Sequence, residues 1–223
     1  GDSAFEGCVA LGSAVFNGEA PQIIGTDIFR FADDDFNIQY FDGYNFPATW
    51  GNYTLTPVST VGDFTFSANA TTGMATITLY KGTGGVVEIP EKFGAMGVRY
   101  IGDSAFAGKV GITSVTMKSG IFSIGNSTFA GVTTLANVTL GSGLSSIGKS
   151  AFQDCDELTS VTIPASVTLI DAGAFSSCDK LTAINVDLNN PIYRSVSGVV
   201  FNKLQTELYH YPAGKPGSSY VTP

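Results

Sequence analysis

The sequence predicts a β-dominated, right-handed solenoid, in which short strands alternate with tight connectors. An Ile-Gly or Ile-Asp pair recurs at a constant spacing, beginning at Ile101, Ile124, Ile147 and Ile170. A Phe follows each pair at a fixed distance, and three further apolar columns keep the same spacing, so that five columns share one period through four copies. A unit of this size has one apolar face and buries it only against its neighbours, which predicts a stack of repeats with one continuous core.

Each repeat is expected to contribute one short strand from the motif L-x-x-V-T-I. In the third copy this motif places Val161 and Ile163 on the inward face, and Thr162 on the outward face, because side chains alternate along a strand. The same positions in successive repeats then form columns, with neighbouring strands about 4.8 Å apart. The 23-residue period lies within the range of leucine-rich repeats.

The connectors carry the phenylalanine column, which predicts a ladder of stacked rings inside the solenoid. Its members follow the same period: Phe106, Phe129, Phe152 and Phe175. The Gly after each Ile is expected to permit a tight turn. The Ser-Ala-Phe or Ser-Thr-Phe that follows is expected to begin a short helical or 3-10 turn capped by the serine. The predicted caps are Ser104, Ser127 and Ser150.

The unit at residues 147–164 reads I-G-x-S-A-F-x-x-C-x-x-L-T-S-V-T-I-P. It resembles the repeat of the BspA-like leucine-rich-repeat family of bacterial cell-surface proteins. Cys155 and Cys178 match the family's cysteine position. The resemblance covers essentially the whole chain, and it implies cell-surface display, adhesion and contact with other proteins.

The flanking segments extend this resemblance and predict the organisation of the chain. Residues 1–57 are expected to hold the end of a first leucine-rich-repeat array and its closing cap. Residues 58–100 read as a β-rich, partly antiparallel linker that opens a second array. Residues 101–186 hold four 23-residue repeats, and residues 187–223 a longer irregular repeat that leads into a truncated one.

Composition excludes several function classes. The 11 basic residues are scattered and are outnumbered by 19 acidic ones, so nucleic-acid binding is not expected. No apolar run is long enough for a transmembrane helix, which argues against membrane insertion within this fragment. The three cysteines cannot all pair within the chain. Cys155 and Cys178 occupy equivalent places in adjacent repeats and are predicted to be buried free thiols.

Catalytic chemistry is not expected either, and no cofactor or metal site is predicted. The chain has one histidine, His210, which lies between two tyrosines with no orienting carboxylate or nucleophile nearby. The recurring Gly-x-Ser strings have Phe where a nucleophile elbow needs Gly. We therefore expect a protein that is not an enzyme.

The outward columns of the strand face are the candidate site for a protein partner. The predicted contact residues are Ser114, Thr116, Asn137, Thr139, Ser160, Thr162 and Asn185. Exposed solenoid faces often bind proteins. The alternative is that these small polar residues only keep an exposed sheet soluble. Aromatic residues gather instead in residues 40–53 and 193–220, where they are expected to seal the solenoid ends or to line a ligand groove.

The resemblance implies an extracellular protein-binding module of a bacterial surface protein, one that adheres to host matrix, serum or other surface proteins. The alternative is a structural spacer or stalk with no partner of its own. The protein is expected outside the cell, with its secretion signal and anchor not in this fragment.

Overall fold

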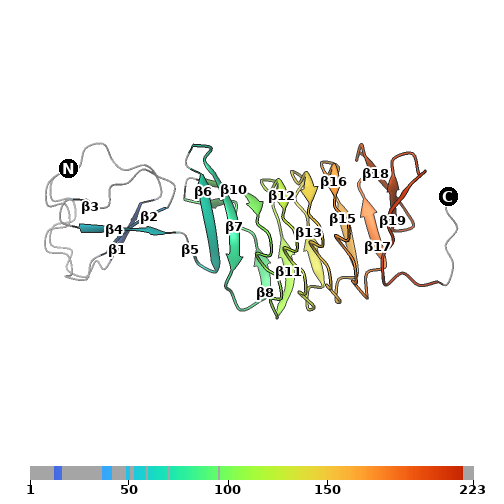
Figure 1. The fold of residues 1–223 in the computed structure, drawn as a ribbon, viewed down its shortest axis with the longest axis horizontal. Helices are drawn as coiled ribbons and strands as arrows, with labels where there is room; N and C mark the ends of the chain where they lie inside the picture. The colour runs from blue at the N-terminus through green and yellow to red at the C-terminus, as the bar shows by residue number, and fades with distance from the viewer. Residues whose placement is uncertain are drawn as a thin grey trace.

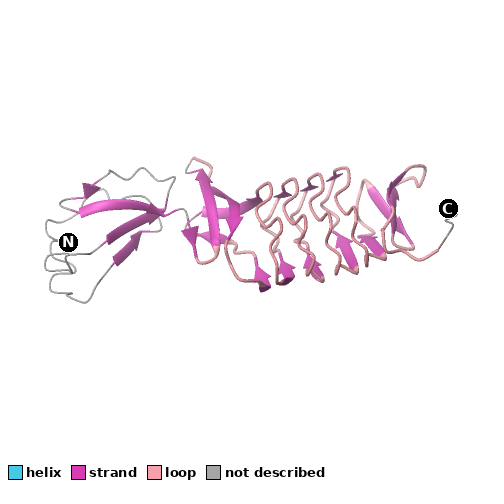
Figure 2. Cartoon of the chain, turned by 60° about the horizontal axis from the view of Figure 1, so that its bottom comes forward, coloured by secondary structure: helices cyan, strands magenta, loops and turns pink. Residues whose placement is uncertain are grey.

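The computed structural model describes residues 13–16, 37–41, 49–50, 53–58, 60–69, 71–94 and 96–217, with side chains described from residue 61 onward. All regular elements in these ranges are strands, arranged as an elongated stack (Figure 1). The described part contains no helix, and turns connect the strands (Figure 2). The helical or 3-10 connectors expected from the sequence are therefore not found there.

Two rows of parallel strands run along the solenoid (Figure 2). We call them the first row and the second row. The first row consists of β10 (Met96–Ile101), β12 (Ser123–Ile124), β14 (Ser146–Ile147) and β16 (Leu169–Ile170). The second row consists of β8 (Gly85–Glu88), β11 (Ile112–Thr116), β13 (Asn137–Thr139), β15 (Ser160–Ile163) and β17 (Ala183–Val186). Ile101 pairs with Ile124, and Ser160 with Ala183, so the pairing register equals the repeat period.

Antiparallel strands open the solenoid. The first row continues through β7, β6 and β5, and β9 pairs with β10. These strands are β5 (Thr60–Val61), β6 (Phe64–Asn69), β7 (Met74–Tyr80) and β9 (Lys92–Phe93). A separate sheet of order β1-β2-β4-β3 precedes them. Its strands are β1 (Ser13–Phe16), β2 (Asn37–Phe41), β3 (Thr49–Trp50) and β4 (Tyr53–Val58). The rest of the predicted first array, Cys8 included, lies outside the described residues.

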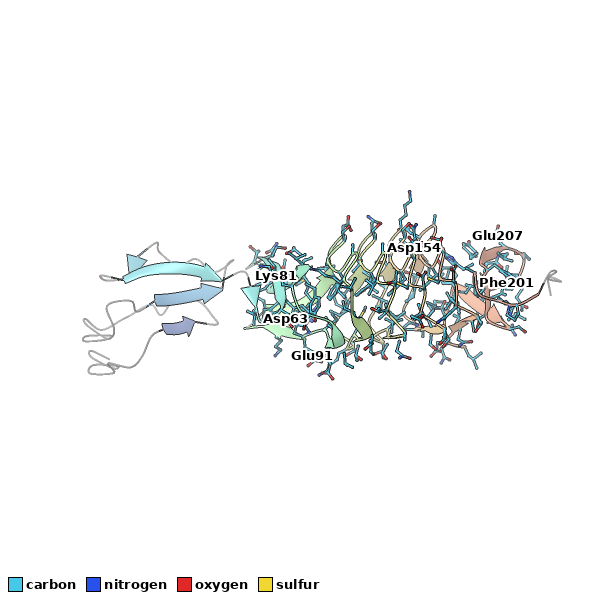
Figure 3. All side chains as sticks on the ribbon, turned by 90° about the horizontal axis from the view of Figure 1, so that it is seen from below. Asp63, Lys81, Glu91, Asp154, Phe201 and Glu207 are labelled. Carbon is cyan, nitrogen blue, oxygen red and sulfur yellow. The ribbon has the colours of Figure 1, made fainter. Side chains whose placement is uncertain are left out.

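An antiparallel insert follows the last repeat. It consists of β18 (Tyr193–Val196), β19 (Val199–Asn202) and β20 (Leu208–His210). In Figure 3, Phe201 and Glu207 mark this end, opposite Asp63 and Lys81. Buried Asn190 fixes the insert, because its amide donates to the carbonyls of Pro164 (2.9 Å) and Val167 (2.8 Å). The Asn190 side-chain oxygen accepts from the backbone of Tyr193 (2.8 Å), whose hydroxyl in turn accepts from the Ile170 N–H (3.1 Å).

The predicted phenylalanine ladder is confirmed. Ring centroids lie 4.8 Å apart between Phe106 and Phe129, 5.1 Å between Phe129 and Phe152, and 5.3 Å between Phe152 and Phe175. All four rings are buried. Tyr80 from β7 stacks on the first ring at 5.0 Å. The column of aromatic rings therefore reaches beyond the four predicted positions into the opening strands.

The connector serines do not cap helices. Ser104, Ser127 and Ser150 have φ of 55°, 51° and 53°, which is left-handed backbone, whereas a helix N-cap has an extended one. A second left-handed residue follows four places later, as at Gly108 and Gly131. This backbone directs hydrogen bonds between repeats rather than along a helix. The N–H groups of the ladder residues show it: Phe106 donates to Thr128 (2.8 Å), Phe129 to Ala151 (2.7 Å) and Phe152 to Ala174 (2.8 Å).

The glycine of each Ile-Gly pair was predicted to permit a tight turn, but the structure shows that the constraint on it is space between repeats. Gly102, Gly125 and Gly148 are not among the residues with positive φ. A Cβ on Gly148 would lie 2.7 Å from the carbonyl carbon of Gly125, and one on Gly125 only 2.7 Å from the Asp103 nitrogen. At Gly125 and Gly148, adjacent repeats approach too closely for a side chain unless the backbone shifts, whereas the fourth repeat accommodates Asp171 at the equivalent position.

The two described cysteines are buried free thiols, as predicted. The Cys155 thiol donates to the carbonyl of Phe129 (3.3 Å), and the Cys178 thiol to that of Phe152 (3.0 Å). Burial raises the pKa of Cys178 to about 11 and raises the pKa of Cys155 further. Both thiols therefore act as weak donors that tie one connector to the preceding repeat.

Candidate functional site

The outward residues of the second row form the two aligned columns expected from the sequence. Ser114 pairs with Asn137, and Thr116 with Thr139, in β11 and β13. In β15 and β17, Thr162 pairs with Asn185. Of the seven predicted contact residues, Ser114 and Thr116 are half-buried, and the others are exposed: Asn137, Thr139, Ser160, Thr162 and Asn185. The repeat thus presents a polar, uncharged strand face.

This face is interrupted at its centre. The strands β8, β11 and β13 form one sheet, and β15 and β17 form another, so that β13 and β15 are adjacent in the stack without being hydrogen-bonded neighbours. In the first row, β12, β14 and β16 pair without interruption at the same repeats. The interruption is therefore confined to one side of the solenoid. We call it the ladder break.

Local sequence contributes to the ladder break from both sides. One repeat further on, the Asp187 N–H donates to the carbonyl of Ile163 (3.0 Å). The equivalent residue, Pro164, has no N–H to donate to Leu140. On the other strand, Gly141 approaches the carbonyl of Lys118 so closely that a Cβ would collide with it. The backbone just after β13 therefore lies close against the preceding repeat.

A groove of about 470 Å³ lies at the ladder break. Four predicted contact residues line it: Asn137, Thr139, Ser160 and Thr162. The remaining lining residues were not predicted: Val138, Leu140, Ser142, Val161, Pro164 and Asp187. The groove therefore combines hydroxyl and amide groups with an aliphatic wall, and its volume falls in the range of small-molecule pockets.

Asp187 provides the charge of the groove, since every other lining residue is neutral. One oxygen of its carboxylate accepts the backbone N–H of Asn189 (2.8 Å). Within the ranges the structure describes, no Lys, Arg or His nitrogen forms an ion pair with it, whereas Glu157 and Glu91 have Lys180 and Lys118 at 2.6 and 4.0 Å. Among these residues, the carboxylate of the groove thus has no cationic partner.

A second surface cluster, on the first row, was missed by the sequence analysis. Tyr100 and Phe122 are 37% and 40% exposed, and their rings meet edge to face at 6.4 Å. The Arg99 guanidinium lies 5.7 Å from the Phe122 ring centroid. A groove of about 290 Å³ beside Tyr100 is lined by Met74 and by small residues of β6 and β7. The sequence does contain a signal for this cluster. Phe122 and Tyr100 are aromatic, whereas later repeats carry Ser145 and Ser146 at the equivalent positions.

The arrangement offers contacts rather than covalent chemistry. His210 is half-buried at the end of the phenylalanine ladder, 6.2 Å from the Phe175 ring, and desolvation lowers its pKa. Among the residues that the structure describes, no group of three His, Cys, Asp or Glu side chains could hold a metal ion. The same residues include no helix long and apolar enough to cross a membrane.

Two rows of parallel strands whose register equals the repeat period, stacked on a ladder of phenylalanines, define a leucine-rich-repeat solenoid. The model of the BspA-type leucine-rich-repeat region matches residues 99–212 in six copies. The chain belongs to this family, whose fold is generally a protein-interaction scaffold rather than a catalytic one. Comparison with curated proteins found no match.

Solved structures of bacterial leucine-rich-repeat proteins are similar. One from Bacteroides capillosus is 33% identical, with a TM-score of 0.53, over 57% of this chain and 96% of that one. The pneumococcal vaccine antigen PcpA is 19% identical, with a TM-score of 0.53, over 75% of this chain and 60% of that one, which is a likeness of fold alone. The leucine-rich-repeat protein of T. pallidum is 28% identical over 55% of this chain and 68% of that one, with a TM-score of 0.48.

Proposed function

We propose that this chain is an extracellular protein-binding module of a bacterial surface protein, and that it binds its partner through the outward columns of the second row. The partner class is a host matrix or serum protein, or another surface protein. The observation that carries the proposal is the groove at the ladder break, because four of the seven predicted contact residues line it.

The groove gives the outward columns a feature that a flat sheet of small polar residues does not have. A flat sheet of serine and threonine has no anchor of the aromatic or arginine type that dominates protein interfaces. A concave site changes this, because a partner side chain that enters it is removed from water and surrounded by hydrogen-bonding groups. The columns on either side then supply polar contacts around the entering side chain.

The spacer function is the second candidate, and the regularity of the stack favours it. The phenylalanine rings keep centroid distances of 4.8 to 5.3 Å through four repeats, and the connectors are hydrogen-bonded from one repeat to the next. Such a stack keeps its length without any partner. A spacer predicts that substitutions in the columns leave every interaction of the chain unchanged.

A binding screen separates the two functions. The chain is immobilised and tested against a panel of extracellular-matrix and serum proteins by interferometry. We expect saturable binding of at least one of them, weakened tenfold or more by Thr139→Arg with Thr162→Arg, since both bulky charges enter the face. Thr168→Arg, on an exposed residue next to the first row, is the matched control and should bind as the wild type does. Absence of binding at tens of micromolar, or equal loss in the control, would argue for the spacer.

A further inference from the structure

We infer that the groove at the ladder break receives the side chain of a lysine or arginine from the partner, with its charged end at Asp187 and its aliphatic stem against Leu140 and Pro164. The inference rests on the proposed function, since it names the chemistry of the partner at the same surface. It commits the partner to a basic residue in the centre of the interface.

Charge complementarity is the first argument. The groove has a single charge, the carboxylate of Asp187. The Asn189 backbone N–H donates to one of its oxygens, which leaves lone pairs on both oxygens for further donors. The ion-paired carboxylates Glu91 and Glu157 lie at other places on the described surface, each with its own lysine. Asp187 thus presents a negative charge that an incoming cation would neutralise.

The composition of the lining is the second argument. Val138, Leu140 and Pro164 provide aliphatic surface in the same groove as the carboxylate. Lysine and arginine match such a site, because their methylene stems lie along apolar surface while the charged end reaches a polar group. An acidic side chain would be repelled by Asp187, and a purely apolar one would leave the carboxylate desolvated without a partner.

The hydroxyl and amide groups beside the groove explain how the basic side chain would be placed. Asn137 and Thr139 stand on one strand, and Ser160 and Thr162 on the other, all lining the same groove. They can donate to and accept from the partner's peptide groups. These contacts tolerate many sequences, so the pairing with Asp187 is the one that selects the side chain.

The test uses four acetylated, amidated pentapeptides of sequence Ser-Thr-X-Thr-Ser, in which X is arginine, lysine, norleucine or glutamate. Binding to the ¹⁵N-labelled chain is followed by backbone amide shifts. We expect the arginine and lysine peptides to move the signals of Thr139, Ser160 and Thr162, and to bind roughly two- to fivefold more tightly than the norleucine peptide. The glutamate peptide should bind least.

Asp187→Asn supplies the decisive variant, because its amide oxygen can still accept the Asn189 N–H while the charge is removed. It should remove the preference for arginine over norleucine. Asp179→Asn makes the same charge change on an exposed residue outside the groove and should keep that preference. Equal binding of arginine and norleucine peptides to the wild type, or an unchanged preference in Asp187→Asn, overturns the inference. Loss of a protein partner in the Thr139 and Thr162 variants would still support the proposed function.

Discussion

The two rows of strands carry the same repeat and differ in continuity. At the boundary between the second and third repeats, the first row keeps its backbone bonds, with the Gly148 N–H donating to the carbonyl of Ile124 (2.9 Å). The second row is interrupted at the same boundary. The repeats stay stacked because Phe129 and Phe152 are 5.1 Å apart, and because the Gly131 N–H donates to Gln153 (2.8 Å) across it. Stacking and pairing are thus separable in this solenoid, and one row is free to form a groove.

Removing a ring from the ladder should destabilise the stack, because the ladder spans the boundary where the second row does not pair. Phe129→Ala is expected to cost about 3–5 kcal/mol, as for other fully buried aromatic rings. Chemical denaturation measures it. Phe122→Ala, the same change at a 40% exposed ring, is the control. Similar midpoints for the two variants would mean that the ladder does not hold the repeats together.

The first row is expected to tolerate an added methyl group poorly at Gly148, because the backbone of the preceding repeat is close there. Gly148→Ala places a Cβ against the Gly125 backbone, at 2.7 Å from its carbonyl carbon. Overpacking of this kind costs about 1–3 kcal/mol. Thermal unfolding would show it as a lowered midpoint. Ser142→Ala, which removes an exposed hydroxyl and adds no bulk, should unfold close to the wild type, and equal losses would mean that the close approach at Gly148 does not limit stability.

Acid should loosen the end of the ladder before its middle. The pKa of His210 is lowered by desolvation from an ordinary value of 6.5, so the folded insert favours the neutral ring. The unfolded chain then binds more protons as the pH falls below that value, and stability decreases in acid. The protection of β18–β20 amides against exchange, relative to the intrinsic rate at each pH, should be lower at pH 5 than at pH 7. In His210→Gln, which cannot titrate, this loss of protection should be smaller; an unchanged loss would assign it to other groups.

Restoring a backbone donor at residue 164 tests the cause of the ladder break. Pro164→Ala introduces an N–H at the position where Asp187 bonds to Ile163 one repeat later. The gain of a hydrogen bond and the greater freedom of the unfolded chain nearly cancel, so we expect a change in stability within about 1 kcal/mol. Hydrogen exchange at residue 164 reports whether the bond forms. A protected amide together with weaker peptide binding would confirm that the groove depends on the missing donor.

The sequence was sufficient for features that follow from the period alone. The columns through Thr139 and Thr162, the stack of Phe129 on Phe152 and the buried Cys155 all belong to positions that recur once per repeat, and periodicity fixes which residues become neighbours. The antiparallel insert was expected only as an irregular repeat, because its pairing does not follow the period.

Other features depend on distances that a periodic pattern does not specify. The left-handed conformation of Ser104 and the steric demand at Gly125 arise from how closely two backbones approach. At the ladder break a proline, Pro164, stands one repeat after the closely packed Gly141, and the sequence pattern presents Pro164 as an ordinary member of the repeat. Asp187 was not identified as a site residue, because it lines a groove at the ladder break and the repeat pattern does not predict that break.

The ladder break also has a mechanical consequence. If the solenoid is pulled along its axis, the load passes from repeat to repeat through the hydrogen bonds of both rows, and at this boundary the strands of one row contribute none. The boundary between β13 and β15 is therefore expected to yield at a lower force than its neighbours. In a single-molecule extension experiment, the chain would lengthen there first, and its partner's side chain would be released before the remaining repeats unfold.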